Sequence, residues 1–131
     1  MDADVQKVTT GQSTSTVLLI DDEPDIRNLY AAFLETEYNV VTASNGAVPL
    51  DLIRDDIDII LSDRRMPGAG GDELLARLRS NDIDIPLILI SATDPDDAPP
   101  CEAYLKKPVT GSELRDHVAK FTRHGTPSAA D

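Results

Sequence analysis

Short runs of Val, Ile and Leu alternate with helical patterns along this chain, and this alternation restricts the fold more than any other feature of the sequence. The runs occupy residues 17–20, 38–42, 57–61, 87–90 and 103–105. Three of them are almost purely aliphatic, which is typical of parallel strands that helices cover on both faces. The sequence therefore predicts an α/β fold with a doubly wound, five-stranded parallel sheet.

Helical spacing fills the gaps between these runs. The clearest set of apolar residues lies on one face of a 3.6-residue repeat: Ile26, Leu29, Tyr30, Phe33 and Leu34. Further helices are predicted around residues 47–54, from about residue 72 and from residue 110, where Thr110 and Glu113 form a capping-box pattern. Each pair of successive runs, except the last, is thus joined by a clear helical pattern.

The connection between the fourth and fifth runs, residues 92–102, departs from that alternation. It is too short for an average helix with two loops, and it contains Pro95, Pro99 and Pro100, which interrupt helices. We therefore predict that the helix expected there, the fourth, is missing or reduced to one turn.

The domain boundaries follow from composition. Residues 1–14 are polar and aperiodic and are predicted to be a flexible leader, residues 15–122 form one domain, and residues 123–131 are predicted to be a flexible tail. Cys101 is the only cysteine, so an intramolecular disulfide is excluded. The apolar runs are too short to cross a bilayer, and the acidic N-terminus is unlike a signal peptide, so a cytoplasmic location is expected.

Polar side chains follow four of the predicted strands. The acidic residues 21–23 come after the first strand, Asp63 after the third, Ser91 after the fourth, and Lys106 and Lys107 after the fifth. The carboxyl ends of parallel strands meet at one edge of the sheet, so these groups should converge. Clustered carboxylates raise each other's pKa, and a hard cation with oxygen ligands such as Mg²⁺ relieves the repulsion.

Four segments together resemble the receiver domain of two-component response regulators: VLLIDDE from residue 17, LSDRRMPGAGG from residue 61, SA from residue 91 and YLKKP from residue 104. The resemblance covers about residues 15–122, and the segment DRRMPGAGGDELL is also similar to haloarchaeal members. It implies a flavodoxin-like fold and a role in phosphorelay signal transduction, in which phosphorylation switches the domain's conformation.

The resemblance also implies roles for individual residues. Asp63 would accept a phosphoryl group from a histidine kinase or a phosphotransfer protein. Lys107, which directly precedes the proline, would pair with a phosphoryl oxygen, and Ser91 would bond to the phosphoryl group once it has formed. Tyr104 matches the aromatic switch position, although a half-buried strand aromatic would explain the same residue.

The same resemblance implies a Mg²⁺ site. Asp22, Asp63 and the main-chain carbonyl of Arg65 would ligate the ion, and Asp21 would orient a metal-bound water. Arg65, two residues after the acceptor, could shield the phosphoryl group or steer the attacking water. Alternatively, Arg64 and Arg65 only offset the nearby negative charge.

Two other functions fit parts of the pattern. One is a receiver-fold adaptor that binds a partner without phosphorylation, which the complete acidic set and Lys107 argue against. The other is a small Mg²⁺-dependent phosphatase with an Asp nucleophile, for which a second aspartate two residues after the acceptor is missing. We expect a receiver that promotes only its own phosphorylation and dephosphorylation. It should act on a downstream effector protein, and it is either a stand-alone domain or a fragment of a longer regulator.

The charge of the chain is strongly negative, with 24 acidic and 12 basic residues and a net charge of −12. This argues against direct binding to nucleic acid or to an anionic membrane. Three acids belong to the predicted metal site, and the remaining 21 have no predicted chemical role.

Such an excess of surface carboxylates suggests a halophilic protein from a high-salt cytoplasm, because salt screens the repulsion between them. The melting temperature should therefore rise between low and molar KCl. A melting temperature that stays the same or falls would contradict this hypothesis.

Overall fold

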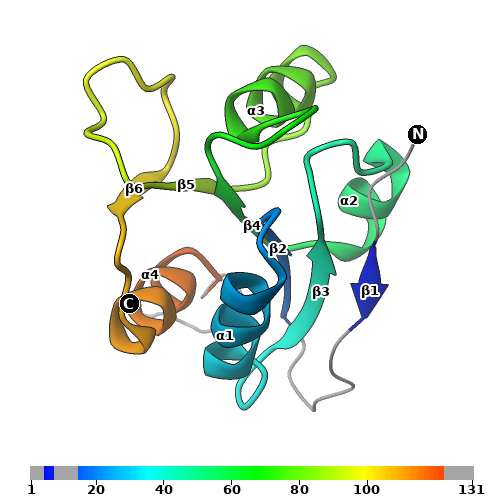
Figure 1. Cartoon of the computed structure of the whole chain (residues 1–131). Coiled ribbons are helices and arrows are strands. Elements are labelled where there is room, and N and C mark those ends of the chain that lie inside the picture. The colour runs from blue at the N-terminus through cyan, green and yellow to red at the C-terminus, as the bar shows by residue number, and fades with distance from the viewer. Residues whose placement is uncertain (1–4, 8–14, 123–131) are drawn as a thin grey trace.

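The computed structural model describes residues 5–7 and 15–122. Five parallel strands form the body of the sheet, in the order β3-β2-β4-β5-β6 (Figure 1). They are β2 (Thr16–Ile20), β3 (Asn39–Ala43), β4 (Ile59–Asp63), β5 (Leu87–Ser91) and β6 (Ala103–Lys106). Every residue of β4 and β5 is buried, as expected for aliphatic strands covered on both faces. The predicted five-stranded parallel sheet is confirmed.

A sixth strand, β1 (Gln6–Lys7), pairs antiparallel with the outer edge of β3. Two residues of the predicted flexible leader, residues 1–14, thus form a strand. The physical reason is that β3 would otherwise be an edge strand, whose unpaired backbone N–H and C=O groups readily bind another strand. Residues 1–4 and 8–14 of the predicted leader, and the predicted tail 123–131, lie outside the described residues.

Within the described ranges, four helices cover the sheet: α1 (Pro24–Leu34), α2 (Leu50–Asp56), α3 (Gly71–Ser80) and α4 (Gly111–Thr122). Side chains of α1 and α4 pack with Val17, Leu19 and Val40 in one core cluster. Side chains of α2 and α3 pack with the alternate strand residues Leu18 and Val41 in the other. The helices therefore lie in two layers, one on each face of the sheet (Figure 1).

The predicted cap of the last helix is present. The backbone N–H of Thr110 donates to Glu113 Oε1 at 3.0 Å, and that of Glu113 donates to Thr110 Oγ1 at 3.1 Å. Pro24 begins α1, where its missing N–H is not needed. Among the described residues, no helix is both long and apolar enough to cross a membrane.

Residues 92–102, all of them described, contain no helix, as the prolines predicted. The segment instead forms an open loop that stands out from the sheet beyond β5 and β6 (Figure 1). This loop occupies the connection where the alternation of strands and helices would place a further helix. We refer to residues 92–102 as the β5–β6 loop.

Candidate functional site

Three carboxylates meet at the carboxyl end of the central strands. Asp63 is the last residue of β4, and Asp21 and Asp22 directly follow β2, which pairs with β4 in parallel. One ligand oxygen from each of the three residues lies within 4.8 Å of the others. Asp21 and Asp63 are only 2% and 8% exposed, whereas Asp22 is open to solvent. The predicted convergence of these three residues is confirmed.

Lys107 reaches into this group from the segment after β6. Its Nζ lies 3.4 Å from Asp21 Oδ2 and 3.5 Å from Asp63 Oδ2. The neighbouring Lys106 is exposed and pairs with Asp94 of the β5–β6 loop at 2.7 Å. Of the two lysines, only Lys107 contacts the acidic group.

The site holds more negative charge than one lysine compensates. Burial raises the pKa of Asp63 to about 6; Lys107 opposes this shift, while Asp21 and Asp22 add to it. Burial alone would lower the pKa of Lys107, but the charges of Asp21 and Asp63 outweigh it, so this pKa is raised. Three clustered carboxylates of this kind fit a hard divalent cation such as Mg²⁺, which prefers oxygen ligands.

The raised pKa of Asp63 predicts how stability depends on pH without metal. The folded protein retains this proton up to about pH 6, whereas the unfolded chain releases it near 3.8. The contribution of Asp63 to the free energy of unfolding therefore falls by about 3 kcal/mol as pH rises through that window. Asp63→Asn should unfold at higher denaturant concentration than the wild type in EDTA at pH 7.5, with the gain shrinking towards pH 4.

The control for this measurement is Asp55→Asn, which neutralises an exposed acid on α2. Equal stability changes in the two variants at pH 7.5 would contradict a destabilising charge at Asp63.

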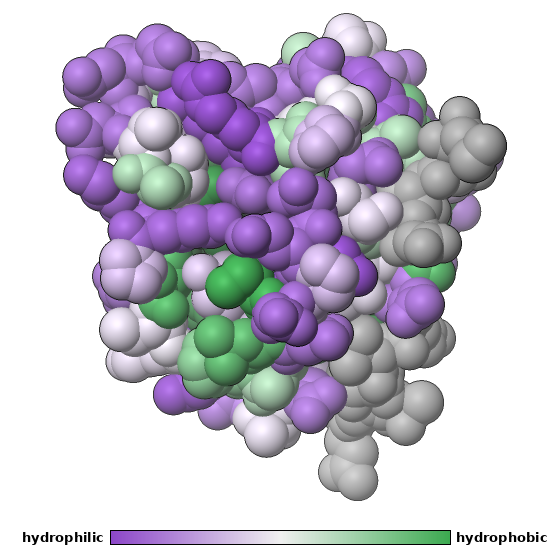
Figure 2. Space-filling view, in the orientation of Figure 1, coloured by the Kyte–Doolittle hydropathy of each residue, from purple (hydrophilic) through white to green (hydrophobic). Residues whose placement is uncertain are grey.

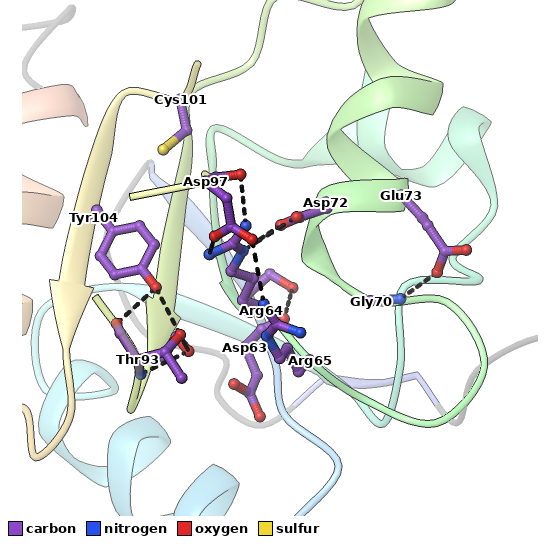
Figure 3. Close-up of polar contacts among 12 residues, drawn as sticks. Asp63, Arg64, Arg65, Gly70, Asp72, Glu73, Thr93, Asp97, Cys101 and Tyr104 are labelled. Carbon is purple, nitrogen blue, oxygen red and sulfur yellow. Dashed lines mark hydrogen bonds and ion pairs between the residues drawn. The ribbon is translucent and has the colours of Figure 1, made fainter. Parts of the chain in front are cut away.

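Ser91 ends β5 at the same edge of the sheet, and its carbonyl accepts the backbone N–H of Lys107 at 2.8 Å. Its hydroxyl is engaged with Thr93, whose Oγ1 lies 3.0 Å away and whose backbone N–H donates to Ser91 Oγ at 3.2 Å. The hydroxyl of Tyr104 in β6 donates to the carbonyl of Thr93 at 2.9 Å (Figure 3). Thr93 therefore connects the two predicted switch residues.

Thr93 did not emerge from the sequence as a site residue. A signal was present, because Ser or Thr hydroxyls often bond a backbone N–H two residues later, as Ser91 does here. The signal is weak, since such local turns are common in loops without any function.

Arg64 and Arg65, which directly follow Asp63, lie in different environments. The side chain of Arg64 is 3% exposed and bonds to Asp72 of α3, whereas that of Arg65 is 63% exposed. Asp97 contacts both arginines (Figure 3). Arg64 is therefore buried and has specific acidic partners, so it does more than offset the nearby negative charge.

The backbone after Asp63 packs closely against the start of α3. The N–H of Gly71 donates to the carbonyl of Arg64 at 3.1 Å. A Cβ atom at Gly71 would lie 2.6 Å from Leu89 Cδ2 and 2.9 Å from the Asp63 carbonyl oxygen, so a larger residue does not fit. The left-handed backbone conformation of this loop falls instead on Gly68, whose φ is 80°.

The sequence model of the response regulator receiver domain matches residues 17–119, which is most of the chain. The protein therefore belongs to the receiver domain family of response regulators, and it is a domain of phosphorelay signalling.

Among curated relatives, the chain is 36% identical over 109 residues to a protein of Haloferax volcanii named as a transcriptional regulator; the match covers 80% of this chain and 19% of that protein. It is 32% identical over 105 residues to the response regulator SaeR of Staphylococcus aureus, covering 75% of this chain and 46% of SaeR. The chain thus spans less than half the length of these relatives.

Solved structures agree with the fold. The Francisella response regulator 1452 receiver domain superposes with a TM-score of 0.76 and 29% identity, covering 86% of this chain and 99% of that one. TrrA of Thermotoga maritima, solved in complex with Mg²⁺ and BeF, gives a TM-score of 0.71 and 30% identity, covering 82% of this chain and 98% of that one.

Proposed function

We propose that Asp63 is the phosphoacceptor of this receiver domain. The observation that carries the proposal is the position of its carboxylate, buried beside Asp21 and Asp22 and 3.5 Å from Lys107 Nζ. A carboxylate oxygen of Asp63 attacks the phosphorus of a phosphohistidine, the P–N bond breaks, and the electron pair leaves with the histidine nitrogen. Lys107 Nζ pairs with a phosphoryl oxygen, which holds the group in line for transfer.

The same residues are proposed to hold Mg²⁺. Asp22, Asp63 and the main-chain carbonyl of Arg65 would ligate the ion, with Asp21 orienting a bound water. When bound, Mg²⁺ supplies positive charge that offsets the negative charge of the phosphoryl oxygens. Asp21 also fixes Lys107, because the two side chains lie 3.4 Å apart within a largely buried site.

Ser91 and Tyr104 are proposed as the switch residues. The hydroxyl of Ser91 sits at the edge of the site but is bonded to Thr93. To bond to a phosphoryl oxygen on Asp63, the Ser91 hydroxyl must rotate away from Thr93. The hydroxyl of Tyr104 donates to the carbonyl of Thr93, so a change at Ser91 and Thr93 also alters the contact of Tyr104 in β6.

The proposed phosphodonor is a histidine kinase or a phosphotransfer protein, and an apolar groove beside Lys107 supports this. The groove is lined by Ile26, Leu29, Tyr30, Ala92, Lys107, Pro108 and Val109. Leu29 is 47% exposed, and Figure 2 shows a hydrophobic patch over α1. An apolar surface at the mouth of a charged site is suited to a protein partner.

The net negative charge of the chain disfavours direct contact with nucleic acid, and the proposed location is the cytoplasm.

The proposed activity is self-modification, in which the domain promotes only its own phosphorylation and dephosphorylation. To test it, the protein is incubated with acetyl phosphate and Mg²⁺ and followed by intact mass and by release of free phosphate. We expect one added phosphoryl group per chain, and no addition in EDTA. No added phosphoryl group would favour the adaptor function. Sustained turnover of a phosphoester, supplied in place of acetyl phosphate, would favour a phosphatase.

A further inference from the structure

Arg64 is the only buried cationic side chain among the described residues. Its Nε donates to both carboxylate oxygens of Asp72 at 3.1 Å, and its Nη2 donates to the backbone carbonyl of Asp97 at 2.9 Å. Its guanidinium carbon lies 5.9 Å from the centre of the Tyr104 ring, within cation–π range. One side chain thus ties α3, the β5–β6 loop and β6 together (Figure 3).

Asp97 bridges the two arginines that follow the acceptor. Its Oδ1 lies 2.9 Å from Arg64 Nη1, and its Oδ2 lies 3.7 Å from Arg65 Nη2. The Arg64 Nη1 contact lacks hydrogen-bond geometry, so this buried nitrogen has no hydrogen-bond partner. Unsatisfied buried donors are rare and costly, so this contact gives up part of the stability that a well-aligned pair would provide. This part of the loop's attachment is therefore weaker than a well-aligned ion pair.

A second chain of contacts joins the same loop to the site. Tyr104, under the guanidinium of Arg64, donates its hydroxyl hydrogen to the Thr93 carbonyl, and Thr93 is bonded to Ser91 Oγ. Ser91 therefore holds the beginning of the β5–β6 loop, while Arg64 holds its middle at Asp97. Ser91 is the last residue of β5, and Arg64 directly follows β4, the strand that ends in Asp63.

We propose that Arg64, Arg65 and Asp97 form a latch that holds the β5–β6 loop against the body of the domain, and that loading of Asp63 with a phosphoryl group opens it. The inference rests on the proposed function of Asp63. The β5–β6 loop, which contains no helix, is then the segment whose position depends on phosphorylation of Asp63.

Two physical effects favour opening on loading. Phosphorylation replaces the single negative charge of the Asp63 carboxylate with about −2 on the phosphoryl group, and the added charge of about −1 competes with Asp97 for the exposed Arg65 side chain. Movement of the Ser91 hydroxyl towards the phosphoryl group removes a bond from Thr93, and thereby loosens the Tyr104 contact under Arg64. Because the coupling is reciprocal, a protein whose latch is already broken should be loaded more easily.

The test compares Asp97→Ala with Asp96→Ala. Both variants remove one exposed acid from the same loop, but Asp96 has no ion pair or hydrogen bond that the structure records, whereas Asp97 forms the latch. Beryllofluoride with Mg²⁺ serves as the probe, and its binding is followed by ¹⁹F NMR. The labelling rate of Cys101, a half-buried thiol near the end of the loop and the only cysteine in the chain, reports release of the loop.

We expect beryllofluoride to raise the labelling rate of Cys101 several-fold in the wild type. Asp97→Ala removes both side-chain contacts but keeps the bond from Arg64 to the backbone carbonyl. It should label faster than the wild type without beryllofluoride and should bind beryllofluoride about 5-fold more tightly or better. Asp96→Ala should behave like the wild type in both measurements.

Two results would overturn the latch. One is a bound ¹⁹F signal with an unchanged labelling rate of Cys101 in the wild type; the other is identical behaviour of Asp97→Ala and Asp96→Ala. Absence of any bound ¹⁹F signal would instead overturn the proposed function, and the coupling with it. The labelling rates of the two variants without beryllofluoride would then still decide whether Asp97 holds the loop.

Discussion

Asp63→Asn should abolish covalent phosphorylation of the protein by acetyl phosphate in the presence of Mg²⁺. An amide oxygen is a far weaker nucleophile than a carboxylate oxygen, and the change also removes a charged ligand from the proposed metal site. Intact mass spectrometry should show the added phosphoryl group on the wild type and none on the variant. The loss should be complete within detection, because the other carboxylate beside Lys107, that of Asp21, is proposed to orient a metal-bound water and not to accept the phosphoryl group.

Asp55→Asn is the matched control, since it makes the same chemical change at an exposed position on α2. It should be phosphorylated like the wild type. Phosphorylation of Asp63→Asn to the wild-type extent would place the acceptor elsewhere, and Asp21 would then be the first residue to replace.

Lys107→Met should lower the rate of phosphorylation by about 100-fold or more while preserving the site's affinity for Mg²⁺ or increasing it. The ammonium group lies within 3.5 Å of both buried carboxylates, so its loss removes a preorganised charge for the phosphoryl oxygens. The same loss leaves the three acids less compensated, which favours a divalent cation. Phosphorylation rates and Mg²⁺ titrations of one protein preparation measure the two effects together.

Lys106→Met is the control for this change, because Lys106 is the exposed neighbour whose partner is Asp94. It should leave both the phosphorylation rate and the Mg²⁺ affinity close to those of the wild type. A parallel loss of both properties in Lys107→Met would indicate a collapsed site, and an unchanged phosphorylation rate would remove Lys107 from the proposed mechanism.

The five parallel strands and the acidic group could be predicted from the sequence for a physical reason. A buried parallel strand needs aliphatic residues on both faces, so the length of the aliphatic run predicts where the strand begins and ends. The residue that follows the strand then lies at the carboxyl edge of the sheet. Asp21, Asp63 and Lys107 follow such strands directly and therefore converge. The missing helix between β5 and β6 was predictable as well, because Pro95, Pro99 and Pro100 restrict the backbone locally.

Other features depend on contacts between distant segments, which a local pattern does not contain. The strand β1 forms only because the edge of β3 accepts Gln6 and Lys7. The burial of Arg64 depends on Asp72 and Asp97, which come from a helix and a loop further along the chain. The roles of Ser91, Tyr104 and the Arg65 carbonyl remain predictions.

The location of the phosphoryl group in the wild-type protein tests most directly whether Asp63 is the acceptor. After reaction with acetyl phosphate, acyl phosphates are reduced with borohydride, and peptide mass spectrometry identifies the converted residue. We predict conversion at Asp63 alone, present with Mg²⁺ and absent in EDTA. Conversion at another residue, or conversion of Asp63 that is equally strong without metal, would contradict a Mg²⁺-dependent phosphoacceptor at the end of β4.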